Sequence, residues 1–166
     1  LFCDRDFDLF DEKGDYESQR RRLDEERQVA AKTILAAGGL AGVLEFAHAV
    51  TAPYEVGRAL GVIASDTFEA EVLPSMLNEL PDSTSGRFVA GFVWARYWVQ
   101  KWTWVDAVLE RDWKAKEKAA LFIRLPFEDE VWQRVATHLG VSDEGLYWKD
   151  AWVNPYGPDR YLTVAI

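Results

Sequence analysis

Apolar residues recur every three or four positions along most of this chain, a spacing that places them on one face of an α-helix. Residues 53–63 follow the i, i+3, i+4, i+7 pattern without interruption, at Val56, Ala59, Leu60 and Ile63. No segment shows sustained alternation of apolar and polar residues with many β-branched side chains, the pattern typical of a half-buried strand. The sequence therefore predicts an all-α protein.

Capping and helix-breaking residues divide this pattern in the first half of the chain. We expect a long helix over residues 16–37 that ends at Gly38-Gly39, after which the apolar phase resumes to about residue 50. Pro53 fits the first turn of the next helix, and Ser65 fits the cap of the one after it. Pro74 lies inside that later pattern, which extends to Leu80, and is expected to kink or split the helix.

The second half of the chain follows a linker rich in Pro, Asp and Ser over residues 80–86. Helices are expected at 88–101, 104–110, around 119–123, at 126–139 and at 142–152, followed by a turn at 154–158 and a last helical piece. About nine helices joined by short breaks indicate an α-α helical repeat or an irregular helical bundle.

Residues 88–101 distinguish these two layouts. This segment is apolar nearly all round, and past its start only Arg96 and Gln100 form a polar strip. A helix of this kind is buried on several sides, as is an inner helix of a stacked array. We therefore favour a solenoid-like α-α repeat, and a weak similarity of pattern between residues 43–80 and 104–139 agrees with it.

The domain organisation follows from the same pattern. Residues 1–15 are expected to form an acidic arm, and residues 16–166 a single α-helical repeat domain. The chain starts at Leu1 and ends on an apolar stretch without a capping residue, so we expect a fragment of a longer polypeptide. The alternative is a removed initiating Met and a tail that packs as it stands.

Composition narrows the compartment and the partners. The chain is 49% hydrophobic, which excludes general disorder, and its net charge of −9 argues against a nucleic-acid surface or attraction to anionic lipid. Cys3 is the only cysteine, which fits a reducing compartment and leaves no thiolate zinc site. No signal-peptide pattern is present, and the apolar run at 88–99 is shorter than the roughly 20 residues of a transmembrane helix. We expect a soluble cytoplasmic protein with no membrane and no nucleic-acid partner.

The candidate chemical sites all fail on spacing. Asp4, Asp6, Asp8 and Asp15 match part of a calcium-binding EF-hand loop, but Leu9 occupies the position that must be Gly. The glycines at 38–42 follow a helix and lack a phosphate-binding motif. His48 and His138 stand apart, with no metal-binding arrangement around either. We therefore expect no catalytic, cofactor or metal residues, and no enzyme activity.

The eight tryptophans are the unusual feature of the composition. Trp94, Trp98 and Trp102 are spaced four apart, which would place them on one helical face. They either fill gaps between stacked helices or form an aromatic groove that anchors a partner. The residues that we expect to be exposed and available for partner contact are Trp94, Arg96, Trp98, Lys101, Trp102, Tyr147, Trp148 and Trp152.

From residue 46 onward the chain resembles the helical-repeat region of large uncharacterised bacterial proteins. The resemblance rests on the segments 53–61, 91–94, 125–127 with Trp132, 139–140 and 147–148. It is similar to TPR and HEAT arrays in layout only, since the 34-residue TPR consensus is not matched. The resemblance implies a helical fold and a bacterial origin, and it implies no activity.

These observations favour a protein-protein interaction or scaffold module without intrinsic catalysis, whose partner is another protein or another domain of the same chain. One alternative is a regulatory or sensor segment of a larger bacterial nucleotide-dependent defence or signalling protein. A self-contained enzyme that uses a carboxylate pair is the third hypothesis, which no motif supports.

Overall fold

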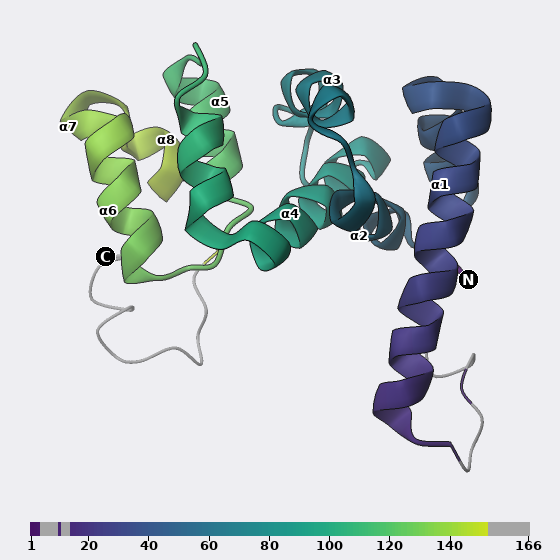
Figure 1. Ribbon diagram of the computed structural model, residues 1–166. Helices are drawn as coiled ribbons and strands as arrows, with labels where there is room; N and C mark the ends of the chain where they lie inside the picture. The colour runs from purple at the N-terminus through teal and green to yellow at the C-terminus, as the bar shows by residue number, and fades with distance from the viewer. Residues whose placement is uncertain (4–9, 11–13, 153–166) are drawn as a thin grey trace. The chain divides into compact units, whose positions relative to one another are not determined.

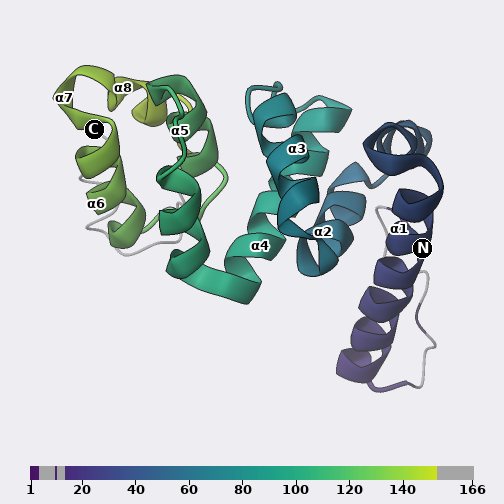
Figure 2. The same ribbon diagram turned by 45° about the horizontal axis from the view of Figure 1, so that its top comes forward.

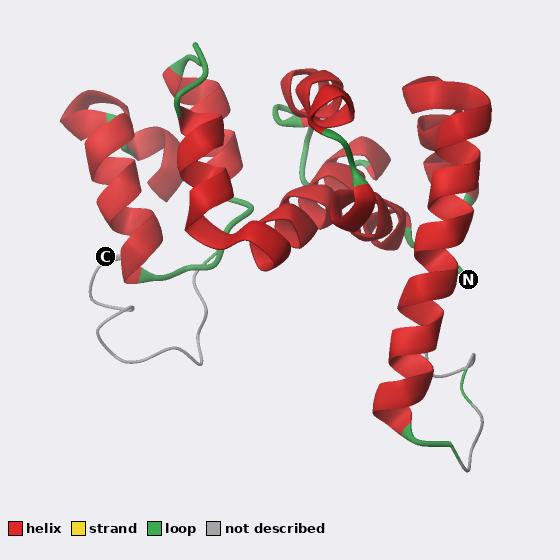
Figure 3. Cartoon of the chain, viewed as in Figure 1, coloured by secondary structure: helices red, strands yellow, loops and turns green. Residues whose placement is uncertain are grey.

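The computed structural model describes residues 1–3, 10 and 14–152, which contain helices and no strand (Figure 1 and Figure 3). The all-α prediction is confirmed. The chain divides into two compact units, residues 1–100 and residues 101–166, and each is described by itself. Most of the predicted acidic arm, the predicted turn at 154–158 and the predicted last helix lie outside the described residues.

Helix α1 (Tyr16–Ala49) opens the first unit. The Asp15 carboxylate caps it by accepting hydrogen bonds from the backbone N–H groups of Glu17 and Ser18, at 3.3 and 3.2 Å. Gly39 interrupts the helix with φ 58° and ψ −155°, angles that glycine adopts without steric cost. The predicted break at Gly38-Gly39 is therefore present, and the helix resumes directly after it.

Two shorter helices follow, α2 (Pro53–Ile63), which lies beside α1, and α3 (Asp66–Met76) (Figure 1 and Figure 2). Pro53 opens α2 and Ser65 caps α3, as predicted, with the Ser65 hydroxyl accepting from the Phe68 N–H at 3.2 Å. Pro74 does not split the helix, because α3 continues through this residue and ends two residues later. The predicted kink at Pro74 stays a prediction. Leu80 lies outside the helix and is 75% exposed.

Helix α4 (Thr84–Leu109) contains both of the helices predicted at 88–101 and 104–110. It starts four residues before the predicted position, inside the segment that we expected to be a linker. Lys101 leaves the helical conformation, with φ 54° and ψ −147°, and so provides the predicted separation between the two parts. It is the one non-glycine residue with positive φ in the described part of the chain.

Glycines bring α2 and α4 into close contact in the first unit. A Cβ atom added to Gly57 would overlap the carbonyl oxygen of Phe88, and one added to Gly91 would overlap the carbonyl oxygen of Tyr54. On the next turn of α2, a Cβ on Gly61 would lie 2.5 Å from the Phe92 carbonyl oxygen. The two backbones therefore pack so closely that side chains are excluded at these positions. Around them the core is made of buried side chains including Leu60, Leu73, Phe88, Val89, Phe92 and Val93.

The second unit contains the end of α4 followed by α5 (Ala115–Phe122), α6 (Asp129–His138), α7 (Gly140–Asp143) and α8 (Gly145–Trp148). Gly140, with φ 66°, separates α6 from α7, which agrees with the predicted helix stop. In place of the single helix predicted at 142–152, the structure has two four-residue helices, α7 and α8. The core of this unit is formed by buried residues including Val105, Leu121, Phe122, Val131, Val135 and Tyr147.

Candidate interaction surface

Two neighbouring turns of α4 present a pair of tryptophans. The rings of Trp94 and Trp98 are stacked, with centroids 6.3 Å apart and an interplanar angle of 19°. Trp94 is half-buried and Trp98 is 63% exposed, and the adjacent Val99 is 55% exposed. A large apolar surface of helix α4 is therefore exposed to solvent. Of the residues that we expected to contact a partner, these two tryptophans form a candidate site.

Arg96 is buried, so our expectation that it is exposed and available for partner contact is wrong. Its guanidinium Nε donates to Oε2 of the buried Glu69 at 2.7 Å, and Nη1 donates to the Ala64 carbonyl oxygen at 3.2 Å. The exposed carboxylate of Asp66 accepts from Nη2 at 3.3 Å. Arg96 therefore holds α4 against the start of α3, a role that sequence spacing missed because its acidic partner lies 27 residues earlier.

Trp102 follows the break at Lys101 and belongs to the second unit. The guanidinium of Arg134 lies 4.2 Å from the centroid of the Trp102 ring, within cation–π range. The same guanidinium donates to both carboxylate oxygens of Asp106, at 2.7 and 3.0 Å, and this hydrogen bonding lowers the pKa of Asp106. Trp102 is thus engaged inside its own unit, whereas Lys101 is exposed as expected.

The three remaining candidate residues differ from one another in burial. Tyr147 is 2% exposed, so the expectation that it is available for contact is wrong, and burial raises its pKa to about 12. The centroid of its ring lies 4.9 Å from that of the half-buried Trp148, and the Trp148 centroid lies 6.1 Å from that of Trp132. Trp152 is 87% exposed. The sequence pattern could not separate these cases, because α7 and α8 are too short to define a face.

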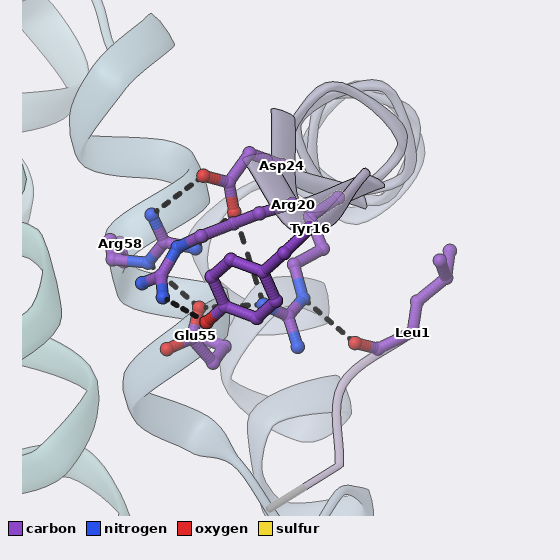
Figure 4. Close-up of polar contacts among 7 residues, drawn as sticks. Leu1, Tyr16, Arg20, Asp24, Glu55 and Arg58 are labelled. Atoms are coloured by element: carbon purple, nitrogen blue, oxygen red, sulfur yellow. Dashed lines mark hydrogen bonds and ion pairs between the residues drawn. The ribbon is translucent and has the colours of Figure 1, made fainter. Parts of the chain in front are cut away.

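A charged network joins α1 to α2 and was not anticipated (Figure 4). The buried Arg27 donates from Nη1 to Oε2 of Glu55 at 3.0 Å and from Nε to the Leu1 carbonyl oxygen at 2.8 Å. Arg58 donates to the same Glu55 oxygen at 2.7 Å and forms an ion pair with Asp24. The hydrogen bonds and charges of Asp24 and Glu55 together raise the pKa of Arg58, against the effect of burial. The charges of these two cations and two anions offset one another, as expected of a structural contact between two helices.

Helix α1 contains a long apolar stretch that we did not anticipate from the sequence. Among the described residues, α1 is the one helix long and apolar enough to cross a membrane, by length and composition only. Its most apolar window of 18 residues is only 11% buried in this structure. Composition of this kind is weak support for a membrane span, since signal sequences and core helices share it. The expectation of no membrane partner stays a prediction.

The described residues contain no cluster of three or more His, Cys, Asp or Glu side chains that could hold a metal ion. Of the histidines, His48 is exposed in the last turn of α1, and His138 lies in the last turn of α6 with its ring 6.4 Å from that of Phe122. Asp4, Asp6 and Asp8 lie outside the described residues.

Comparisons of the chain with protein-family models, with curated proteins and with solved structures found no significant match.

Proposed function

We propose that this chain is a helical protein-interaction module without catalysis of its own, and that Trp94 and Trp98 form the centre of its contact face. The observation that carries this proposal is the exposure of Trp98 while its ring is stacked on Trp94. Tryptophan is enriched among residues that dominate binding energy at interfaces. Stacking fixes the orientation of the exposed ring in advance, which lowers the entropy lost on binding.

The partner that fits this face is a protein, or another domain of the same polypeptide. The net charge of −9 disfavours nucleic acid, because a phosphate backbone would be repelled. We place the module in a bacterial cytoplasmic scaffold of solenoid-like α-α repeats. Short helices joined by short connections, as in α2 to α3, support that layout, and so does the close packing of α2 on α4.

The proposal can be tested by selecting binders from a random peptide library displayed on phage, with the purified chain as bait. We expect peptides whose affinity falls at least 10-fold when Trp98→Ala replaces the wild type, because truncation of a central interface tryptophan typically costs about 2 kcal/mol or more. Leu80→Ala is the matched control, since Leu80 is an apolar residue of the same unit that is 75% exposed, compared with 63% for Trp98. Thermal melting of both variants tests whether they remain folded.

Two outcomes would overturn the proposal. If all selected peptides bind Trp98→Ala and the wild type equally well, the contact face lies elsewhere. If Trp98→Ala unfolds the chain while Leu80→Ala does not, the stacked pair has a structural role.

A further inference from the structure

A short segment that precedes α1 is anchored on this helix by one aromatic side chain. Residues 1–3 lie outside any helix, and only 7% of Phe2 is exposed. The Phe2 ring packs edge-on against the ring of Phe46, with centroids 5.4 Å apart and an interplanar angle of 82°. Aromatic pairs favour this edge-to-face arrangement. Phe2 is thus the buried residue of the segment, between the exposed Leu1 and the half-buried Cys3.

Arg27 of α1 holds the same segment. Its Nε donates to the Leu1 carbonyl oxygen at 2.8 Å (Figure 4), and its guanidinium carbon lies 5.9 Å from the centroid of the Phe2 ring, within cation–π range. Only 1% of Arg27 is exposed, and its Nη1 donates to Glu55 of α2 at 3.0 Å. Glu55 therefore helps to fix the guanidinium in the orientation that meets the segment. One buried cation contacts both a backbone carbonyl and an aromatic ring.

These contacts define the chemistry of the ligand. The Leu1 carbonyl that Arg27 binds is common to all amino acids, and the Leu1 side chain is largely in solvent, since 47% of the residue is exposed. Selectivity therefore rests on the ring of Phe2. We propose that Phe46 and Arg27 form a peptide-binding site for an aromatic residue, that residues 1–3 fill it as a tethered ligand, and that an aromatic segment of a partner protein takes their place.

The covalent connection determines how such a site works. Residues 4–15 join the segment to the start of α1, and a connection of this length holds a ligand at an effective concentration of about 1 mM. A partner segment binds only when it competes with this concentration. The tethered ligand thus lowers the apparent affinity of the site, and its displacement moves the half-buried Cys3 into solvent.

The test uses a fluorescein-labelled synthetic peptide of residues 1–6 that carries Cys3→Ser, and measures its binding to the full chain by fluorescence anisotropy. The Phe2→Ala chain should bind this peptide at least about 10-fold more tightly than the wild type, because its tethered ligand lacks the competing ring. A second peptide that also carries Phe2→Ala should bind the same chain at least about 10-fold more weakly. Thermal melting tests whether the Phe2→Ala chain remains folded.

Cys3 provides a second measurement. Its rate of labelling by a maleimide reports how often the segment leaves the site, and saturating unlabelled peptide should raise this rate in the wild type, without any substitution. In the Phe2→Ala chain the rate should be about 10-fold higher or more even without peptide, because burial of a phenylalanine ring shifts the docking equilibrium by at least that factor. Leu1→Ala is the matched control and should keep the wild-type rate, because it retains the carbonyl that Arg27 binds.

Equal binding of the two peptides to the Phe2→Ala chain, or no binding of either, would overturn the proposal. A Cys3 labelling rate that neither Phe2→Ala nor added peptide changes would also overturn it, since the segment would then not fill the site. Trp98→Ala separates this inference from the proposed function, because Trp98 belongs to α4 and Phe46 to α1. Trp98→Ala should leave peptide binding unchanged, and a loss of binding would place the peptide on the tryptophan face instead.

Discussion

Arg96 and Glu69 form a buried ion pair between α4 and α3, in which the guanidinium Nε donates to the carboxylate Oε2 at 2.7 Å. Only 5% of Arg96 and 2% of Glu69 are exposed to water. Removing the Glu69 charge leaves the buried Arg96 guanidinium with the solvent-exposed Asp66 carboxylate as its acidic partner among the described residues, a loss that costs more than the intact pair contributes.

Glu69→Gln should therefore lower the free energy of unfolding by about 3–5 kcal/mol, as measured by urea denaturation. Glutamine has nearly the same shape, so the loss reflects charge rather than packing. Asp66→Asn is the matched control, because Asp66 contacts the same arginine from a fully exposed position and should leave stability nearly unchanged. Equal effects of the two substitutions would show that burial does not determine the strength of these contacts.

Adjacent glycines in α1 should respond to alanine in opposite directions. Gly38→Ala should stabilise the protein by about 0.5–1 kcal/mol, since Gly38 lies in the helix and an added Cβ meets no atom within 4 Å. Gly39→Ala should destabilise it by about 1–3 kcal/mol, because a residue with a Cβ atom is strained at the φ of 58° that Gly39 adopts. The surroundings of Gly39 are as open as those of Gly38, so steric overlap does not contribute. Thermal unfolding of the two variants distinguishes these signs, and stabilisation by Gly39→Ala would contradict the break.

The contact between α2 and α4 is expected to be sensitive to a single methyl group. Gly57→Ala should lower stability by about 1–3 kcal/mol or more, because the new Cβ would overlap the Phe88 carbonyl oxygen and force the two backbones apart. Gly42→Ala is the control, since its added Cβ would lie at an ordinary 3.9 Å from the Ile34 carbonyl oxygen. Comparable unfolding free energies for the two variants would show that α2 and α4 are not in backbone contact.

Local signals in the sequence predicted most helix boundaries. Pro53 at a first turn, Ser65 as a cap and Gly39 as a break depend on neighbouring residues alone, and each was confirmed. The apolar pattern predicted that the helix around Pro74 extends to Leu80, whereas α3 ends at Met76, two residues after the proline, and is not split there.

The candidate site was less predictable because exposure depends on distant partners. Arg96 has the sequence character of a surface residue, and only the folded chain brings Glu69 to it. The burial of Tyr147 was also not predictable, because α8 is too short for the spacing of apolar residues to indicate which of its sides is buried. Trp98, by contrast, is apolar and yet exposed, so no rule that equates hydrophobicity with burial separates it from Phe92.

Ionisation of Tyr147 should make the free energy of unfolding decrease at alkaline pH. Burial raises its pKa to about 12, whereas an unfolded tyrosine ionises near about 10. A raised pKa in the folded state means that the stabilisation is complete below about pH 10 and is lost between about pH 10 and 12, because the unfolded chain releases its proton first.

Tyr147→Phe removes this ionisation and keeps the ring. At pH 8 the variant should be somewhat less stable than the wild type, or equal to it. Above about pH 10 the wild type should lose up to roughly 1.4 kcal/mol per pH unit relative to the variant, as followed by urea unfolding at pH 8, 10 and 11. If the difference between the two proteins stays constant over this range, the Tyr147 hydroxyl ionises equally in the folded and unfolded chains, and its burial against Trp148 is not maintained in solution.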